Sequence, residues 1–318
     1  MYRNPHTESV AIAVIGGSGV YKLDCLKNAR YYDVPTPYGN PSGQLCVAEV
    51  KGVPCVFLPR HGPHHTYNPS EVNYRANICA LKIMGVRYIL AINAVGSLDE
   101  KYKPGDLALC NQIIDKTYAR KATFFEDGVV AHVDFAHPIS HALNTIVYQA
   151  LSLCFPGAVD GKDGGFTIHK SGTLVTMEGP QFSTKAESIL NKSIGGHLIG
   201  MTSATEARLA REAEIAYATV AMVTDMDAWS DAPHVDVSQV LQVVAANAEK
   251  AQCYPPVIIK SLAENLFDDP AHHALQYAIM TKPEHIPEET KKRIAPLVAA
   301  KYPQFAPSSA SVGGGEDS

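Results

Sequence analysis

The stretch Ala216–Trp229, AYATVAMVTDMDAW, decides how the rest of the chain is interpreted. Its first part is an apolar run rich in β-branched residues that ends at Val223, which is typical of a strand buried on both faces of a sheet. Asp225 and Asp227 follow this run. If the chain stays extended, side chains two positions apart point the same way. Two carboxylates then lie at the carboxyl end of a buried strand, where open α/β sheets place their ligand crevice. A helix N-cap followed by a solvated acid is the alternative interpretation.

Strands and helices alternate along the whole chain. Apolar runs predict at least six buried strands, several of which end in a polar or glycine-containing loop, at residues 11–15, 45–50, 53–58, 88–92, 173–177 and 216–223. This order predicts an α/β fold with a mixed central β-sheet flanked by helices. Because no linker or repeat divides the chain, we expect a single domain over residues 1–306. The Ser/Gly-rich, acidic residues 307–318 predict a disordered tail.

Capping signals place the helices. Ser70 is expected to cap a helix over 70–84, and Ser140 begins a helix that continues to Leu153. Two capping boxes are predicted, one from Thr184 and Glu187 and one from Ser203 and Glu206. The second box puts Thr202 at a helix N-terminus, where backbone N–H groups favour an anion. Further helices are expected from Ser238 and over 256–266, 271–280 and 287–300.

Composition excludes several classes of function. The 318 residues carry a net charge of −5 with no basic tract, which argues against nucleic acid or an anionic membrane surface as partner. No apolar run approaches the roughly 20 residues of a membrane span, and the N-terminus lacks a signal core. The seven cysteines form no CxxC pair, so we expect a cytoplasmic protein with reduced core thiols. A catalytic thiol is the alternative.

Two loops indicate an anion site. Gly16–Gly19 follows the first strand, and its backbone N–H groups can cradle an anion, although a plain tight turn explains the same glycines. Lys22 stands where the third glycine of a dinucleotide fingerprint belongs, which argues against NAD. Arg60 ends another strand, and its guanidinium suits two phosphate oxygens at once. Three histidines follow it, but no cysteine or carboxylate joins them at ligand spacing, so we expect no metal.

Six motifs in order resemble the trimeric purine nucleoside phosphorylase family, most closely its branch that acts on 5′-methylthioadenosine. The similarity runs from about Ala11 to Gln252. It rests on IGGSG (Ile15–Gly19), PRHG (Pro59–Gly62), NAVGSL (Asn93–Leu98), TMEGPQFST (Thr176–Thr184), GMTSATEARLARE (Gly200–Glu212) and TDMDAW (Thr224–Trp229).

The resemblance implies that orthophosphate attacks the anomeric carbon of a purine nucleoside, with no metal or organic cofactor. By the matching motifs, phosphate would be bound by Gly17, Ser18, Arg60, His61, Asn93, Ala94 and Thr202. Asn93 departs from the threonine of the human-type enzymes. The ribose would lie against Met201, and Phe182 with Ser183 would flank the purine.

The chemistry assigns the two acids. The departing purine gathers negative charge, and Asp225 near N7 would donate or share a proton while Asp227 binds the exocyclic amine or holds Asp225. Relatives specific for 6-oxopurines carry Asn in place of Asp225. An aspartate favours adenine, because it can accept a hydrogen bond from the 6-amino group. Val237 replaces the histidine that those relatives present to the 5′-hydroxyl. With Val240 and Leu241 it would form an apolar pocket suited to a methylthio group.

The same resemblance implies a homotrimer in which His132 reaches the pocket of the neighbouring subunit. The predicted reaction is phosphorolysis of 5′-methylthioadenosine to adenine and 5-methylthioribose 1-phosphate, in purine and methionine salvage. One alternative is a broad-specificity or 6-oxopurine phosphorylase acting on inosine, guanosine or methylthioinosine. Another is a catalytically silent nucleoside-binding protein, which the combination of Arg60, Thr202 and Asp225 disfavours.

Overall fold

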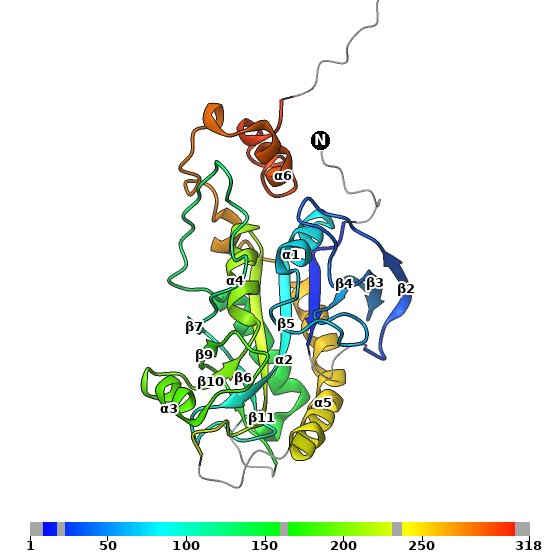
Figure 1. Ribbon diagram of the computed structural model, residues 1–318. Coiled ribbons are helices and arrows are strands. Elements are labelled where there is room, and N and C mark those ends of the chain that lie inside the picture. The colour runs from blue at the N-terminus through cyan, green and yellow to red at the C-terminus, as the bar shows by residue number, and fades with distance from the viewer. Residues whose placement is uncertain (1–8, 18–22, 160–164, 231–236, 309–318) are drawn as a thin grey trace, which may run out of the picture.

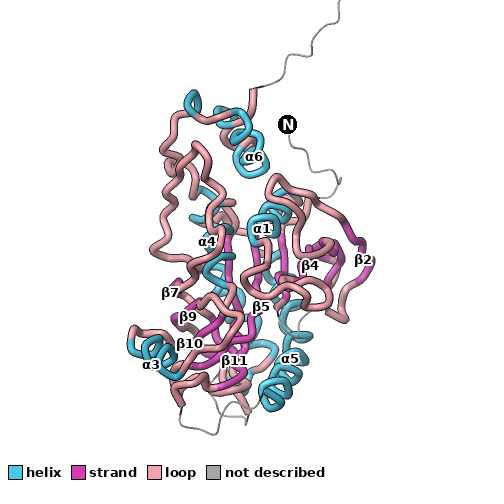
Figure 2. Tube along the Cα trace, viewed as in Figure 1, coloured by secondary structure: helices cyan, strands magenta, loops and turns pink. Residues whose placement is uncertain are grey.

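The computed structural model describes residues 9–17, 23–159, 165–230 and 237–308, with side chains from 240 onward in the last range. In these ranges eleven strands form one mixed sheet with helices around it (Figures 1 and 2). The strands are β1 (Ile12–Gly16), β2 (Lys27–Tyr32), β3 (Leu45–Val50), β4 (Val53–Pro59), β5 (Tyr88–Ser97), β6 (Leu107–Leu109), β7 (Gln112–Asp115), β8 (Ile168–His169), β9 (Thr173–Thr176), β10 (Leu198–Gly200) and β11 (Ala216–Asp225). The predicted fold class is confirmed.

The sheet is organised around β5 and β11, which pair in parallel from Tyr88 and Ala216 onward. β1 lies parallel to both β4 and β5, whereas β10 is antiparallel to β5 and β6 is antiparallel to β11. β11 is buried throughout except at Asp225, its last residue. This burial on both faces is the reason for its continuous apolar sequence.

A gap in the pairing of β5 creates the site. β11 occupies one edge of β5, so β1 and β10 must share the other edge. The β1 pairing ends at Ile92, and the β10 pairing begins at Gly96. Within the described chain, residues 93–95 therefore have no strand beside them on that edge. Their side chains and backbone are left to line a pocket.

Five of the helices pack in two groups around the sheet, one of three helices and one of two. α1 contacts α4 and α6, and α2 contacts α5 (Figure 1). Their bounds are α1 (Tyr74–Ile83), α2 (His141–Cys154), α3 (Lys185–Ser193), α4 (Ser203–Glu212), α5 (Val237–Glu264) and α6 (Glu288–Val298), with 3₁₀ turns at Pro156–Ala158, Pro270–His273, Pro283–His285 and Pro303–Phe305. Ser140 caps α2, and the capping box of Thr184 and Glu187 opens α3, both as predicted.

Several helix predictions were wrong. α1 is capped by Asn73, whose side chain accepts from the Ala76 amide, and not by Ser70. α5 continues through Pro255 and Pro256 as a single helix, because neighbouring prolines interrupt its hydrogen bonding without forcing a new start. The segment predicted as a helix over 271–280 forms a 3₁₀ turn and further turns instead.

The irregular segment 116–140 packs against the C-terminal segment, near α6 at one end of the molecule (Figure 2). Arg293 contacts Asp127, and Ala131 forms an isolated bridge with Ile279. Ser308 bonds to Glu288, and the rest of the predicted tail lies outside the described residues, as does most of the glycine-rich insertion at 157–165. Cys46, Cys55, Cys79 and Cys110 are buried, and all seven cysteines are unpaired. None of the described helices has the length and apolar character to cross a membrane.

Candidate active site

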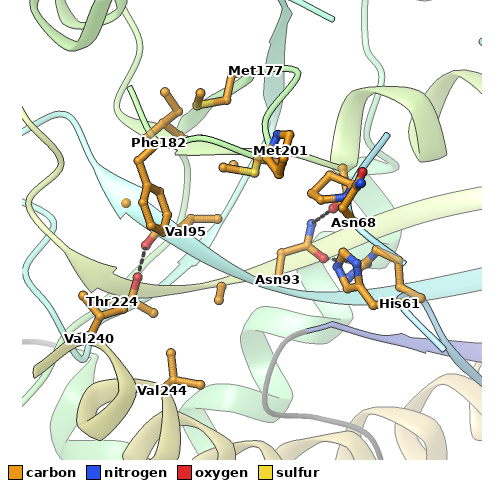
Figure 3. A pocket seen from close by; sticks show the side chains of 18 of the residues that line it. His61, Asn68, Asn93, Val95, Met177, Phe182, Met201, Thr224, Val240 and Val244 are labelled. Carbon is orange, nitrogen blue, oxygen red and sulfur yellow. Dashed lines mark hydrogen bonds between the residues drawn. The ribbon is translucent and has the colours of Figure 1, made fainter. Parts of the chain in front are cut away.

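A pocket of about 800 Å³ opens where β5, β10 and β11 end beside α4 and α5 (Figure 3). It is lined by Arg60, His61, His65, Thr66, Asn68, Pro69, Glu71, Asn93, Ala94, Val95, Gly96, Met177, Pro180, Phe182, Ile199, Gly200, Met201, Thr202, Thr224, Asp225, Asp227, Val240, Leu241 and Val244. Figure 3 shows His61 and Asn93 on one side of it, Phe182 and Thr224 on the other, and Val244 below. Within the described chain, residues from five of the six motifs, all but Ile15–Gly19, thus line one pocket although they are far apart in the sequence.

Arg60, Asn93 and Thr202 form the side of the pocket that we call the anion side. Arg60 Nη2 donates to Asn93 Oδ1 over 2.7 Å, and Asn93 Nδ2 lies 3.4 Å from Thr202 Oγ1. Thr202 is the N-cap residue of α4, so the first N–H groups of that helix begin here, and of these the Ala204 amide donates to Thr176 Oγ1 over 3.2 Å. Ala94 lies beside them in the edge gap of β5.

Gly17 lies against Arg60 but is not among the residues that line the pocket, and it fits there only because it lacks a side chain. A Cβ there would lie 2.5 Å from Arg60 Nη1 and 2.7 Å from the Ile92 carbonyl oxygen. The backbone of Gly17 therefore approaches the Arg60 guanidinium as closely as packing allows. Ser18, also predicted to bind phosphate, lies outside the described residues.

Arg60 is paired with a buried acid that the sequence analysis misassigned. Its guanidinium is 1% exposed and forms a two-point ion pair with Glu206 of α4. Glu206 was predicted to close a capping box with Ser203, but α4 has no side-chain cap, and Glu206 points to Arg60 instead. Burial alone would lower the pKa of Arg60, and the neighbouring Glu206 carboxylate more than offsets this, so the pKa is raised.

His61 is a neutral member of the anion side at pH 7. Burial, with the nearby charge of Arg60, lowers its pKa to about 4. Its Nδ1 lies 2.9 Å from the Tyr67 carbonyl oxygen, which only accepts, so Nδ1 carries the hydrogen and Nε2 the lone pair. His65 stacks on the ring at 4.4 Å. Across the ranges described, no three His, Cys, Asp or Glu side chains are grouped as metal ligands would be.

Asp225 and Asp227 line the opposite side, which we call the acid side. The pairing of β11 with β5 shifts register between Val223 and Asp225, and Asp225 then lies opposite Gly96. A Cβ on Gly96 would lie 3.0 Å from Asp225 Oδ1, so the glycine leaves room for this carboxylate. Asp225 accepts from the Thr224 hydroxyl over 2.6 Å and from the Asp227 amide over 2.9 Å.

The two acids do not project side by side from an extended chain. β11 ends at Asp225, and Asp227 has φ 45°, in the left-handed region. A turn, not strand alternation, brings both to the pocket, and the Asp227 carboxylate accepts from the Ser188 hydroxyl of α3. Burial raises the pKa of Asp227. The Ser188 hydrogen bond lowers this pKa and the charge of Asp225 raises it, and the net shift is upward.

The remaining predicted contacts divide between the pocket and its surroundings. Phe182 is 71% exposed and lies at the rim, while Ser183 is buried outside the lining, and its hydroxyl lies 3.5 Å from Met177 Sδ. Met201 lines the pocket between the two sides (Figure 3). Val240 and Leu241 of α5 also line it, joined by Val244 one turn on. Val237 begins α5, and its side chain lies outside the described part.

A second buried ion pair, between Arg120 and Glu178, supports the wall that carries Met201. Arg120 donates to the carbonyl oxygens of Glu178 and Met201. Burial would raise the pKa of Glu178, but the Ser70 hydroxyl, two backbone amides and Arg120 hold it at about 2. Sequence reasoning missed both residues. Glu178 carried a signal as part of a motif, whereas nothing marked Arg120 within its irregular segment.

His132 lies away from this chain's pocket. Its side chain is exposed, and its backbone amide donates to the Ala278 carbonyl near the C-terminal segment. A role in a neighbouring subunit therefore stays a prediction.

Comparisons with known proteins identify the family. Residues 11–253 match the model of the phosphorylase superfamily. The chain is 49% identical over 296 residues to S-methyl-5′-thioadenosine phosphorylase of Chloroflexus aurantiacus, covering 92% of this chain and 99% of that protein. It is 46% identical over 290 residues to the enzyme of that name from Rhodospirillum rubrum, covering 89% and 92%.

Solved structures agree. A methylthioadenosine phosphorylase from an Antarctic soil metagenomic library superposes with TM-score 0.86 at 43% identity, covering 92% of this chain and all of that one. A mutant adenosine/methylthioadenosine phosphorylase from Schistosoma mansoni, solved in complex with methylthioadenosine, gives 0.75 at 36% identity, covering 81% and 93%. The chain belongs to the phosphorylase superfamily, as a member of its methylthioadenosine phosphorylase family.

Proposed function

We propose that this protein catalyses phosphorolysis of 5′-methylthioadenosine to adenine and 5-methylthioribose 1-phosphate, with orthophosphate as co-substrate and no metal or organic cofactor. One observation carries the proposal. A single pocket of about 800 Å³ has anion-binding groups on one side and a carboxylate, Asp225, on the other. That volume suits a nucleoside together with phosphate.

Phosphate binds on the anion side in this proposal. Arg60 supplies a guanidinium N–H, and the first turn of α4 at Thr202 supplies backbone N–H groups and the positive end of the helix dipole. Neutral His61 offers its Nε2 lone pair to a P–OH group, since Nδ1–H is directed to Tyr67. Held in this way, a phosphate oxygen faces the sugar carbon that becomes cation-like as the glycosidic bond lengthens.

The purine leaves from the acid side. As negative charge develops on the base, Asp225 in its protonated form donates its proton to N7 and is left as the carboxylate. The Asp227 amide and the Thr224 hydroxyl each donate to Asp225, which fixes the carboxylate in one orientation. Phe182 at the rim provides an aromatic face for the base.

An apolar surface supports methylthio as the 5′ group. Val240, Leu241 and Val244 line the pocket on α5, and none offers a hydrogen bond to a 5′-hydroxyl. A thioether buried there needs no polar partner. Over 92% of its length the chain is similar to the Chloroflexus aurantiacus enzyme, and over 92% to the methylthioadenosine phosphorylase from the Antarctic soil library.

We further propose a homotrimer in the cytoplasm. The exposed His132, which lies away from its own pocket, is available to a neighbouring subunit. The seven unpaired cysteines suit a reducing compartment.

The test measures phosphate-dependent release of base. The purified protein is incubated with 5′-methylthioadenosine, adenosine or inosine, each with and without phosphate, and with and without EDTA. We expect adenine from methylthioadenosine at the highest kcat/KM, strict dependence on phosphate and no effect of EDTA. Hydrolysis without phosphate, or a preference for inosine, would refute the proposal. Sedimentation velocity gives the subunit number.

A further inference from the structure

The guanidinium of Arg60 has almost no donor left unassigned. Arginine has five N–H groups. Nε donates to Glu206 Oε1, Nη2 donates to Glu206 Oε2 over 3.0 Å and to Asn93 Oδ1 over 2.7 Å, and Nη1 donates to the Ile92 carbonyl over 3.2 Å. Among partners in the described chain, four N–H groups are thus assigned. The fifth is on Nη1, the atom that lies against Gly17.

Glu206 is itself held from two elements. It lies in the first turn of α4 and is 1% exposed. Tyr217 of β11 donates its hydroxyl to Glu206 Oε2 over 2.9 Å. Burial and the adjacent Glu206 raise the pKa of Tyr217, so the hydroxyl stays a donor. The Glu206 carboxylate is therefore held by contacts other than Arg60. Its position is set by α4, the helix whose N-terminus forms the anion side.

The pair contributes direction more than charge. Glu206 cancels the positive charge of Arg60 at contact distance, so the pair as a whole attracts a distant anion only weakly. What remains is one oriented N–H beside Gly17. If the guanidinium turned away from its present orientation, that N–H would move and a buried donor would be left unpaired. Glu206 does not also cap the helix, because α4 has no side-chain cap.

We infer that Glu206 is a positioning residue for phosphate: with Tyr217 behind it, it holds the Arg60 guanidinium so that the remaining Nη1–H points into the anion side. This inference rests on the proposed function for the identity of the anion. It assigns to a buried acid on α4 a part in phosphate affinity, although Glu206 itself touches no substrate.

The experiment compares Glu206→Gln, Glu206→Asp and Tyr217→Phe with wild type. In Glu206→Gln an amide N–H₂ faces a guanidinium donor, so the guanidinium must turn. We expect the phosphate KM to rise about 10- to 100-fold, with the nucleoside KM within about threefold of wild type. Glu206→Asp keeps the charge and both oxygens and should recover most of the loss. Tyr217→Phe should raise the phosphate KM severalfold.

Glu212→Gln on the same helix is the matched control. Glu212 is also buried, but it accepts from Thr123 and Phe124, away from Arg60. We expect its phosphate KM to match wild type. If Glu206 acts only by charge, removing its negative charge should lower the phosphate KM of Glu206→Gln. A lowered or unchanged value would overturn the inference. If Glu206→Gln does not fold, Tyr217→Phe decides by the same criterion.

Failure of this inference is distinguishable from failure of the proposed function. Wild-type turnover with phosphate tests the function alone. Calorimetric titration of wild type and the variants with inorganic phosphate tests positioning without turnover. Weakened binding in Glu206→Gln, with binding retained in Glu212→Gln, supports the inference even for an inactive chain, and equal binding in both refutes it.

Discussion

Replacing Asp225 by asparagine isolates its role in the reaction, because the structure accommodates the amide. Asp225 Oδ1 accepts from the Asp227 amide, and an asparagine oxygen retains this bond. The other oxygen accepts from the Thr224 hydroxyl, which also lies 3.1 Å from the Val95 carbonyl. In the variant the hydroxyl donates to Val95 and accepts from the new Nδ2–H. Every hydrogen bond is kept, so we expect stability to change by no more than about 1 kcal/mol.

The kinetic loss should be much larger than the loss of stability. The asparagine amide can donate a hydrogen bond to N7 but has no acidic proton to transfer to it, and positioned proton transfer contributes about 10²–10⁴ in rate. This corresponds to about 2.7–5.4 kcal/mol in the activation free energy. We therefore expect kcat for methylthioadenosine to fall by that factor while the phosphate KM stays within about threefold of wild type.

The assay follows adenine release at saturating phosphate, with thermal unfolding measured on the same preparations. Asp268→Asn is the matched control, because this aspartate lies on the surface in the C-terminal segment and should leave kcat unchanged. A kcat for Asp225→Asn within tenfold of wild type, in a protein with the wild-type melting temperature, would refute the assignment of Asp225 as the acid.

Three further predictions follow from the pocket and from α4. Phe182→Ala should raise the nucleoside KM about 5- to 50-fold, the value of one base–aromatic stack, with an unchanged melting temperature because the ring is exposed; an unchanged KM would remove it from the base site. Val240→Thr replaces a methyl group of the apolar surface by a hydroxyl of similar size. It should raise the methylthioadenosine KM severalfold and leave the adenosine KM unchanged. Equal changes in the two KM values would place the 5′ group elsewhere. Burial raises the pKa of Glu212 from 4.5 to about 7 against its bonds to Thr123 and Phe124. Because the folded state then binds the proton more tightly, stability is lost as pH rises from 4.5 to 7, by about 3 kcal/mol in total. Thermal melts at pH 5 and pH 8 should show a smaller decrease in Glu212→Gln than in wild type, and an equal decrease in both would contradict the argument.

The strands that build the site were predictable from sequence because they are buried on both faces. β1, β5 and β11 each contain a short continuous apolar run, although β5 continues through Asn93 to Ser97, beyond the end predicted at Ile92. The hairpin between β3 and β4 was equally clear, since Lys51 and Gly52 both adopt positive φ, which a tight two-residue turn requires. These are local signals. They need no knowledge of what lies across the sheet.

Predictions failed where a polar side chain had a distant partner. Ser70 was predicted to cap a helix, but its hydroxyl donates to Glu178, 108 positions further along the chain. Asp227 was placed by strand alternation, yet its φ of 45° and its bond to Ser188 depend on where α3 packs. Nothing in the local sequence distinguishes a serine that caps a helix from one that holds a buried carboxylate.

Charge compensation is the property of this site that local patterns cannot show. A sequence motif presents Arg60 as a free cation, and Arg120 is not marked at all, whereas in the fold each guanidinium meets a buried carboxylate, Glu206 or Glu178. His61 is neutral at pH 7 because its pKa is about 4. The anion side therefore offers N–H donors at the start of α4 and on Arg60 more than net positive charge. In the proposed function, phosphate is therefore held where these donors converge and not by a strong surrounding positive field.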